Sequence, residues 1–419
     1  MNDMKRTHVN FSKKNSFDLY HYILLGVAFL SSGHVYSVTK GNLCHYILFG
    51  ALCFMLVKIS INRSIRIMNK KLLIIPIFIL ITFIIDMIMN FMFNYNLLYS
   101  IRFFTILIFS YIFTMEMNFE AFRKIYVKCM TIMSAIGLIG FVIGSFSGFY
   151  YNLPTITNIN GISYYDAFVF FGMNDFSRGR NIGVFWEPGI FAIFITLAVL
   201  FLLFDRGKLN RLQISILILT LFSTLSTTGY FLIAIIFFSI TFLRKKQGLM
   251  KLIFLIFFAF FAIFALFNSS IIFNSLSNLF PRVFTKLIDN SASTVHRLDS
   301  IKYNFEIFIK SPIWGSGLVK TNLLFSEITN GTQTSTMTLY LAQFGLLGLI
   351  YILAQFTAIA KYSSWSRSVC ILFCITWLIL LNVEIVTFFP LIYIISFYFI
   401  KGRLLSTASI KQEVYNNIC

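Results

Sequence analysis

Charged residues are scarce in this chain of 419 residues, and acidic residues are the scarcest. Only 12% of the residues are charged, and 15 acidic side chains stand against 34 basic ones. Hydrophobic residues make up 58% of the sequence, and the mean hydropathy is +0.82. This composition excludes an ordinary soluble globular protein and predicts an all-α polytopic membrane protein.

Several motifs that carry well-known chemistry are also missing. The sequence has no Walker loop, no Rossmann glycine pattern and no His cluster with metal-ligand spacing. It therefore gives no support for ATP-driven transport, dehydrogenase chemistry, a metal or another cofactor. None of the six cysteines falls within 149–185 or 269–335, so no disulfide framework is expected there. Cys370 and Cys374 share a helix face, but with no His or carboxylate nearby we interpret them as packing residues.

Apolar runs of about 20 residues predict twelve membrane spans. The predicted spans are 17–33, 42–58, 72–91, 97–115, 128–148, 186–204, 212–227, 229–243, 252–268, 336–359, 369–383 and 386–400. The start, residues 1–16, is polar and basic, and we expect no cleaved signal. The two closely spaced pairs, 212–243 and 369–400, are also compatible with a long helix or a re-entrant hairpin each, although both contain turn residues.

Basic residues mark every second connection, which predicts that both termini face the cytoplasm. The net charge of +19 is then explained by basic loops beside an anionic leaflet, and nucleic-acid binding is not expected. We expect an N-terminal five-span bundle (1–148), a first large periplasmic loop (149–185) and a four-span segment (186–268). A second large loop (269–335), with a short amphipathic helix over 300–309, precedes a three-span segment and cytoplasmic tail (336–419).

The most informative segment is 180–189, which reads RNIGVFWEPG and runs directly into an apolar span. Proline in the first turn of a helix gives up no backbone N–H that the helix needs, so Glu187 is expected at the mouth of the helix. Arg180 and Glu187 are costly at that depth unless they are paired or solvated. The pair indicates a site that handles a polar, anionic, lipid-linked substrate.

Arginines near the outer face are candidates for binding a diphosphate, because a guanidinium offers planar, bidentate donors. Arg180 and Arg297 are the first candidates, and Arg282 and Arg102 are weaker ones. The alternative for each is that it reaches lipid headgroups or pairs with a local carboxylate.

Two residues are candidates for proton transfer. Glu187, if half-buried, would have a raised pKa suited to a general base, or it would form a salt bridge to Arg180 that fixes the loop. His296 would act as a neutral base near pH 7, or would simply be solvated. Asp86, inside the third span, is either functional or satisfies a neighbouring helix. We interpret the remaining membrane-proximal histidines as packing or interface residues: His21, His34 and His45.

Three segments, in this order, resemble the O-antigen polymerase and O-antigen ligase superfamily. The first is 180–188, similar to that family's Arg-x-x-Gly-x-Phe-x-Glu-Pro step before a span. The second comprises HRL at 296–298 and IKSPIWGSG at 309–317, similar to its Arg, short helix and Pro-x-x-Gly-x-Gly turn. The third is LAQFGLLG at 341–348, which opens the following helix, and a Ser-rich turn at 226–229 also matches.

The resemblance implies a GT-C-like protein of the bacterial inner membrane, with about twelve spans and two large periplasmic loops. It implies metal-independent, inverting glycosyl transfer from an oligosaccharide linked to undecaprenyl diphosphate. Arg180 and Arg297, with Arg282 or Arg102, would neutralise the diphosphate, and Glu187 or His296 would supply the base. The implied partners are the lipid-linked oligosaccharide, membrane lipids and a separate chain-length regulator protein.

One departure bears on which reaction is expected. Many ligases carry a His-Asn pair about eleven residues before the Gly-x-x-Gly turn, and this chain has Thr334 and Ser335 there. The absence of that His favours a polymerase of lipid-linked repeat units over a ligase that transfers glycan to lipid A core or protein. A flippase for lipid-linked oligosaccharides is the alternative from another class. Flippases usually have short loops and charges that line a cavity in mid-membrane, whereas the outer-facing charge here is concentrated in two long segments.

Overall fold

The computed structural model describes residues 19–61, 70–91, 97–147, 149–158, 161–173, 180–203, 210–226, 228–230, 232–236, 292–329, 333–362 and 365–416. These residues are mostly helical. Four helices are long and apolar enough to cross a membrane, and they span Gly41–Ile61, Lys71–Met89, Leu97–Glu116 and Phe119–Gly144. Several shorter apolar helices accompany them. The apolar helices suggest membrane insertion, in agreement with the predicted class.

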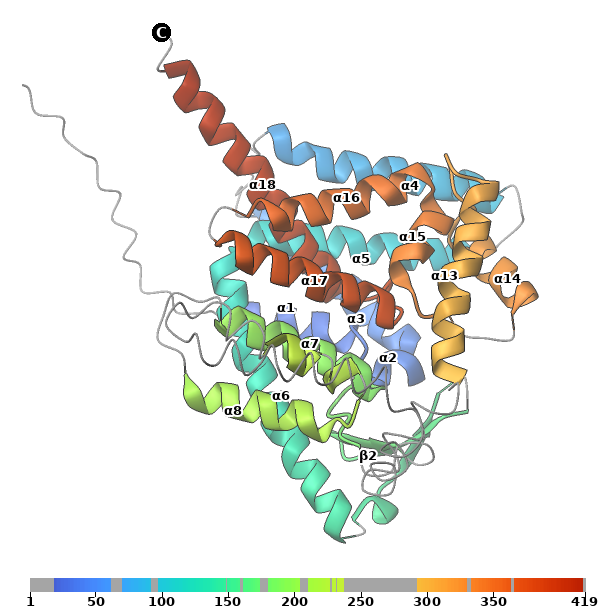
Figure 1. Ribbon diagram of the computed structural model, residues 1–419, viewed down its shortest axis with the longest axis vertical. Helices are drawn as coiled ribbons and strands as arrows, with labels where there is room; N and C mark the ends of the chain where they lie inside the picture. Colours follow the sequence, from blue (N-terminus) through green and yellow to red (C-terminus); the bar gives the residue numbers. More distant parts are fainter. Residues whose placement is uncertain are drawn as a thin grey trace, which may run out of the picture.

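The helices of the N-terminal half follow the predicted spans closely. They are α1 (Leu19–Leu30), α2 (Val35–Thr39), α3 (Gly41–Ile61), α4 (Ile74–Phe91), α5 (Leu97–Glu116), α6 (Phe119–Ser147), α7 (Pro188–Leu203) and α8 (Arg211–Ser223), with 3-10 turns η1 (Lys70–Leu73) and η2 (Phe149–Asn152). Helix α6 begins nine residues before the predicted 128–148 span. Most of these helices run beside one another across the view in Figure 1.

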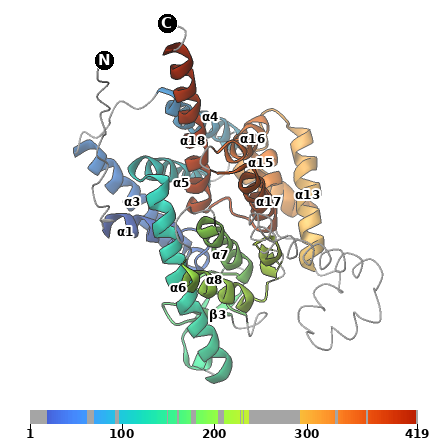
Figure 2. The ribbon, with the colours of Figure 1, turned by 60° about the vertical axis from the view of Figure 1, so that its left-hand side comes forward.

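The C-terminal half contains α13 (Ala292–Lys310), α14 (Leu318–Ile328), α15 (Thr336–Phe344), α16 (Leu346–Ala360), α17 (Arg367–Val383) and α18 (Pro390–Asn416). The predicted span 252–268 and most of 229–243 lie outside the described residues. Helix α13 includes the expected amphipathic segment 300–309 and extends it by eight residues towards the N-terminus. It stands across the ends of α16 and α17 (Figures 1 and 2).

The expectation of an all-α chain needs a correction in the first large loop. Three strands form an antiparallel sheet in the order β1 (Thr155–Thr157), β2 (Ser163–Asp166), β3 (Phe171–Met173). Tyr164 and Phe171 are buried against the helices, so the sheet caps the bundle. The strands are too short for their alternating pattern to stand out in a sequence that is apolar throughout.

Helix α7 lies at the centre of the bundle. Every residue from 188 to 201 is buried, and α6, α8 and α17 pack around it. Helix α4 instead exposes a broad apolar face, as expected of a helix that contacts lipid. Its exposed side chains include Ile74, Ile77, Leu80, Ile84 and Ile88. The helix that follows Glu187 is therefore held by protein on all sides.

The predicted single span 336–359 is broken at Gly345 into α15 and α16. Gly345 adopts a positive φ of 56°, and the turn 313–317 packs its backbone into the break. The amide of Leu346 donates to the Ile313 carbonyl at 3.1 Å, and the amide of Gly317 donates to the Gln343 carbonyl at 2.9 Å. The second and third segments of the family resemblance thus interlock through their glycines.

We expect Gly345→Ala to destabilise the protein strongly. A Cβ at this position would lie 2.6 Å from both the Gly315 nitrogen and the Ile313 oxygen, which are backbone atoms, and the positive φ disfavours any side chain. The expected loss is more than about 2 kcal/mol, seen as a lower midpoint of thermal unfolding in detergent. Gly50→Ala is the matched control, since nothing lies within 4 Å of a Cβ there. Equal midpoints for the two variants would contradict this role of Gly345.

Candidate functional site

Residues 180–187 are fixed by backbone hydrogen bonds to three other parts of the chain. The amide of Val35 donates to the Val184 carbonyl, and the amide of Trp186 donates to the Gly33 carbonyl, each at 3.0 Å. The amide of Phe171 in β3 donates to the Gly183 carbonyl at 2.8 Å. Near the start of the segment, the side-chain amide of Asn181 donates to the hydroxyl of Ser223, the last residue of α8. The segment therefore joins the α1–α2 turn, the sheet and α8.

Arg180 is half-buried at the start of this segment. Its Nε–H donates to the carbonyl of Thr224 at 3.2 Å. Burial lowers the pKa of Arg180, and Glu187, Tyr230 and Glu384 counteract this in that order. The guanidinium remains charged, because its ordinary pKa is far above neutral. The structure thus brings the predicted pair Arg180 and Glu187 into one electrostatic cluster.

Glu187 stands at the start of α7, where the sequence places it, and its backbone carbonyl accepts from the amide of Phe191 at 3.2 Å. It also faces the sheet. Burial, and then the charge of Glu187, raise the pKa of Tyr164 in β2 to about 12. The carboxylate of Glu187 therefore interacts electrostatically both with Arg180 and with Tyr164 of the central strand of the sheet.

Glu384 is the residue of this cluster that the sequence analysis did not single out. It is buried, with 8% of its surface exposed, in the link between α17 and α18. Thr336 holds this link, since its hydroxyl donates to the Glu384 carbonyl at 2.9 Å and accepts from the amide of Val386 at 2.8 Å. A Cβ on Gly189 would lie 3.4 Å from Glu384 Oε1. In the sequence, Glu384 is a lone carboxylate between two apolar runs, and this pattern is the signal that could have identified it.

Helix α13 is tied to the same end of the bundle by a polar network. Asn304 exchanges side-chain hydrogen bonds with Gln333, and Ser300 Oγ accepts from the amide of Thr334 at 3.0 Å. The chain then continues directly into Ser335 and Thr336, and Thr336 holds the Glu384 link. Residues 296 and 297 lie in α13, one turn before Ser300.

The side chains of His296 and Arg297 lie outside the described part of the structure, and so does all of Arg282. Their proposed roles remain predictions. Thr334 and Ser335, which occupy the place of the ligase His-Asn pair, are both engaged. The hydroxyl of Ser335 donates to Asn382 Oδ1 at 2.8 Å, and that of Thr334 lies 3.2 Å from Ser300 Oγ.

Asp86 satisfies a neighbouring helix, the second of the two interpretations open from the sequence. Its Oδ1 accepts from the amide of Leu318 at 2.8 Å, at the first residue of α14. A carboxylate at a helix N-terminus pairs with an amide that has no partner within the helix. Asp86 is 1% exposed, so this contact anchors α14 to α4 inside the bundle.

Arg102 belongs to a different place. Its terminal Nη2–H donates to Asn42 Oδ1, and it lines a cavity between α3 and α5. In the described part of the chain, the lining of this cavity contains neither Arg180 nor Glu187 nor Glu384. The structure therefore does not bring Arg102 together with the Arg180 cluster.

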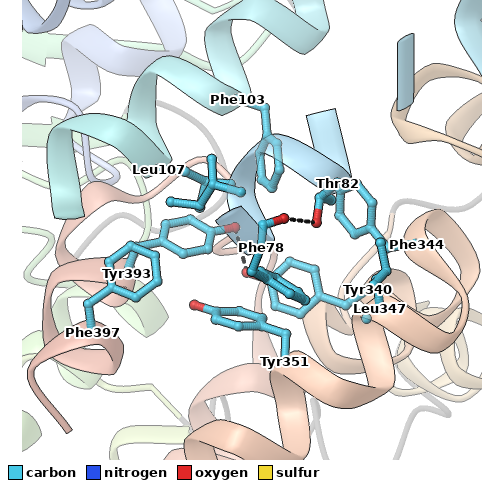
Figure 3. Close-up of a pocket in the computed structure, with 12 residues that line it drawn as sticks. Phe78, Thr82, Phe103, Leu107, Tyr340, Phe344, Leu347, Tyr351, Tyr393 and Phe397 are labelled. Carbon is cyan, nitrogen blue, oxygen red and sulfur yellow. Dashed lines mark hydrogen bonds between the residues drawn. The ribbon is translucent and has the colours of Figure 1, made fainter. Parts of the chain in front are cut away.

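Three tyrosines surround a second, smaller cavity, shown in Figure 3. The hydroxyls of Tyr340 and Tyr393 lie 2.6 Å apart, Tyr393 donates to the Thr387 carbonyl, and Tyr351 donates to Ser396 Oγ. The cavity volume is about 30 Å³, room for roughly one water. Because every hydroxyl is paired and the walls are otherwise apolar, we interpret it as a packing defect.

No family model matches the chain, and no curated protein is significantly similar to it. The resemblance described above therefore rests on the quoted residues alone.

His34 lies in the α1–α2 turn that anchors residues 184–186. Its burial there predicts that the stability of the protein depends on pH. Its Nδ1 accepts from the amide of Tyr36 at 3.1 Å as the N-cap of α2, and its backbone pairs with Phe185. Burial outweighs the opposing charge of Asp166 and lowers the pKa of His34 from 6.5 to about 4. The folded state therefore prefers neutral His34.

The contribution of neutral His34 to the free energy of unfolding is complete above pH 6.5. It is lost as the pH falls from 6.5 towards 4, because over this range the unfolded chain binds a proton at His34 and the folded chain does not. The loss approaches about 3 kcal/mol. We expect His34→Asn, which keeps a capping oxygen but does not titrate, to lose less stability over this range. Unfolding midpoints at pH 7.5 and 4.5 measure the difference. The same loss in both proteins would exclude His34 as its source.

Proposed function

We propose that this protein polymerises oligosaccharide repeat units linked to undecaprenyl diphosphate, at the periplasmic face of the bacterial inner membrane. The observation that carries the proposal is the cluster of Arg180, Glu187 and Glu384. Arg180 and Glu187 belong to the first segment that resembles the O-antigen polymerase and ligase superfamily, and the second and third segments interlock with each other at the Gly345 break. Both termini would face the cytoplasm, and a separate chain-length regulator would be a partner.

The reaction is an inverting glycosyl transfer. A hydroxyl of one lipid-linked repeat unit attacks the anomeric carbon of the sugar at the donor's reducing end. The new carbon–oxygen bond forms as the bond to the diphosphate oxygen breaks, and its electron pair leaves with undecaprenyl diphosphate. The hydroxyl proton passes to a carboxylate, either Glu187 or Glu384, or to His296. A single displacement of this kind needs no metal if cations stabilise the leaving group.

The charge balance of the Arg180 cluster bears on which residues bind the diphosphate and which orient and deprotonate the hydroxyl. One guanidinium, Arg180, stands against two carboxylates, so these three groups together carry a net negative charge when all are ionised. Such a cluster is better suited to orienting and deprotonating a hydroxyl than to binding a diphosphate alone. We therefore propose that Arg297 of α13 and Arg282 neutralise the diphosphate in addition to Arg180.

A ligase is the nearest alternative, because it would use the same donor. The hydroxyl-bearing Thr334 and Ser335 in the place of its His-Asn pair disfavour it, since neither is a base near neutral pH. A flippase would need a path for the whole oligosaccharide past the bundle centre. The complete burial of 188–201 in α7 argues against such a path beside this helix.

The test is the glycan ladder of a deletion strain complemented with variants at equal membrane abundance. We expect wild type to restore the ladder. Arg180→Ala, Glu187→Gln and Glu384→Gln should leave a single repeat unit, with polymer reduced by about 100-fold or more. Glu327→Gln is the matched control, since this glutamate is exposed on α14, and it should restore the full ladder.

Two outcomes would overturn the proposal. If the deletion leaves bare lipid A core while long lipid-linked polymer accumulates, the protein is a ligase. If bare core appears with neither polymer nor exported repeat units, it is a flippase, and the assigned roles of the carboxylates fall with the polymerase.

A further inference from the structure

The cavity lined by Arg102 lies between the N-terminal ends of α3 and α5, beside the start of α18. Its volume is about 260 Å³, against about 30 Å³ for the tyrosine cavity. The polar part of its lining comes from Ser31, Ser37, His45 and Arg102. Leu48, Ile106 and Phe388 contribute apolar walls. The cavity therefore has a polar, basic portion and an apolar portion.

Two polar atoms of residues that line this cavity are buried without a hydrogen-bond partner among the described residues. They are Oγ of Ser31 and Nε of Arg102. Buried donors in native proteins are nearly always paired, and an unpaired one costs about 1–3 kcal/mol. Both atoms belong to residues that line the same cavity. Neither atom has accessible surface as the side chains stand, so each side chain must rotate for its atom to reach an acceptor inside the cavity.

The charge of the lining selects the class of that acceptor. Arg102 is a permanent cation, and its hydrogen-bond partner Asn42 is a neutral amide. No carboxylate occurs among the residues that line the cavity in the described part of the chain. A guanidinium in a largely apolar site strongly favours an anion with several acceptor oxygens, and a phosphate provides them in matching geometry.

The surroundings indicate that the phosphate belongs to a lipid. Helices α3 and α5 both carry exposed apolar side chains on either side of their cavity residues. These are Leu43 and Ile47 on α3, and Leu98 and Ile101 on α5. A hydrocarbon chain lying on this surface, or along Leu48 and Ile106, would bury apolar area while its headgroup enters the polar portion.

We propose that this cavity, the α3–α5 pocket, binds the phosphate of an anionic lipid through Arg102 and Ser31. The site is separate from the Arg180 cluster and does not depend on the proposed polymerase activity. A lipid held here would fill the space between α3 and α5 beside the α18 N-terminus.

The test is lipid binding to the full-length protein in detergent by native mass spectrometry. Phosphatidylglycerol is the probe, and diacylglycerol with the same chains and inorganic phosphate are the comparison ligands. We expect phosphatidylglycerol to bind and diacylglycerol to bind at least tenfold more weakly. Arg102→Gln should weaken phosphatidylglycerol binding about tenfold, and Ser31→Ala should weaken it by a smaller factor. The control Arg211→Gln, at an exposed arginine that begins α8, should change nothing.

Each other outcome overturns the proposal. Equal binding of phosphatidylglycerol and diacylglycerol would show that the surface binds only hydrocarbon chains. Binding of inorganic phosphate as tight as that of the lipid would show a site for soluble anions. Should Arg102→Gln fail to fold, Leu48→Trp, which fills the apolar portion from the other side, is measured in its place. Unchanged lipid binding in a folded Leu48→Trp protein would exclude the cavity.

Discussion

Inside an apolar helix bundle, every interruption of a helix exposes backbone amides and carbonyls that must find partners within the protein. This constraint organises the structure. The α1–α2 turn bonds residues 184–186, and the end of α8 bonds Asn181. The turn 313–317 fills the α15–α16 break, and Thr336 holds the link after α17. The backbone groups at these interruptions form hydrogen bonds with one another. Polar backbone groups are therefore gathered at one end of the bundle.

Polar side chains follow the same constraint, and it separates structural from chemical roles. Asp86 is buried, yet its contact with the first amide of α14 accounts for its presence. The Tyr340–Tyr393 pair is likewise self-satisfied. By contrast, Arg180 interacts electrostatically with two carboxylates, Glu187 and Glu384, at the start of a buried helix. Several charged groups gathered at one half-buried place, rather than one polar group with one structural partner, distinguish a candidate site from a structural contact.

The sequence was a good guide where one strong physical signal acts alone. Apolar runs located α3, α4, α5, α7 and α17, because burial in a membrane demands them. It was a poor guide where tertiary contacts decide. The break at Gly345 lies in a run that is apolar on both sides, and it becomes visible only when the 313–317 turn packs into it. Glu384 was overlooked because nothing local in 369–400 indicates that Thr336 and Gly189 lie beside it.

The two sides of the proposed site also differ in how firmly they are held. Glu187 begins α7, which belongs to the main hydrophobic core from its first residue. Helix α13 instead packs through a separate small cluster of Ile307, Phe325 and Ala342, together with the hydrogen bonds of Ser300 and Asn304. Elements with fewer buried apolar contacts open at lower free energy. For the proposed polymerase, a rearrangement that admits a bulky lipid-linked glycan would therefore cost least at α13. The carboxylate of Glu187, beside the rigid helix α7, would then stay in place to orient the hydroxyl that attacks.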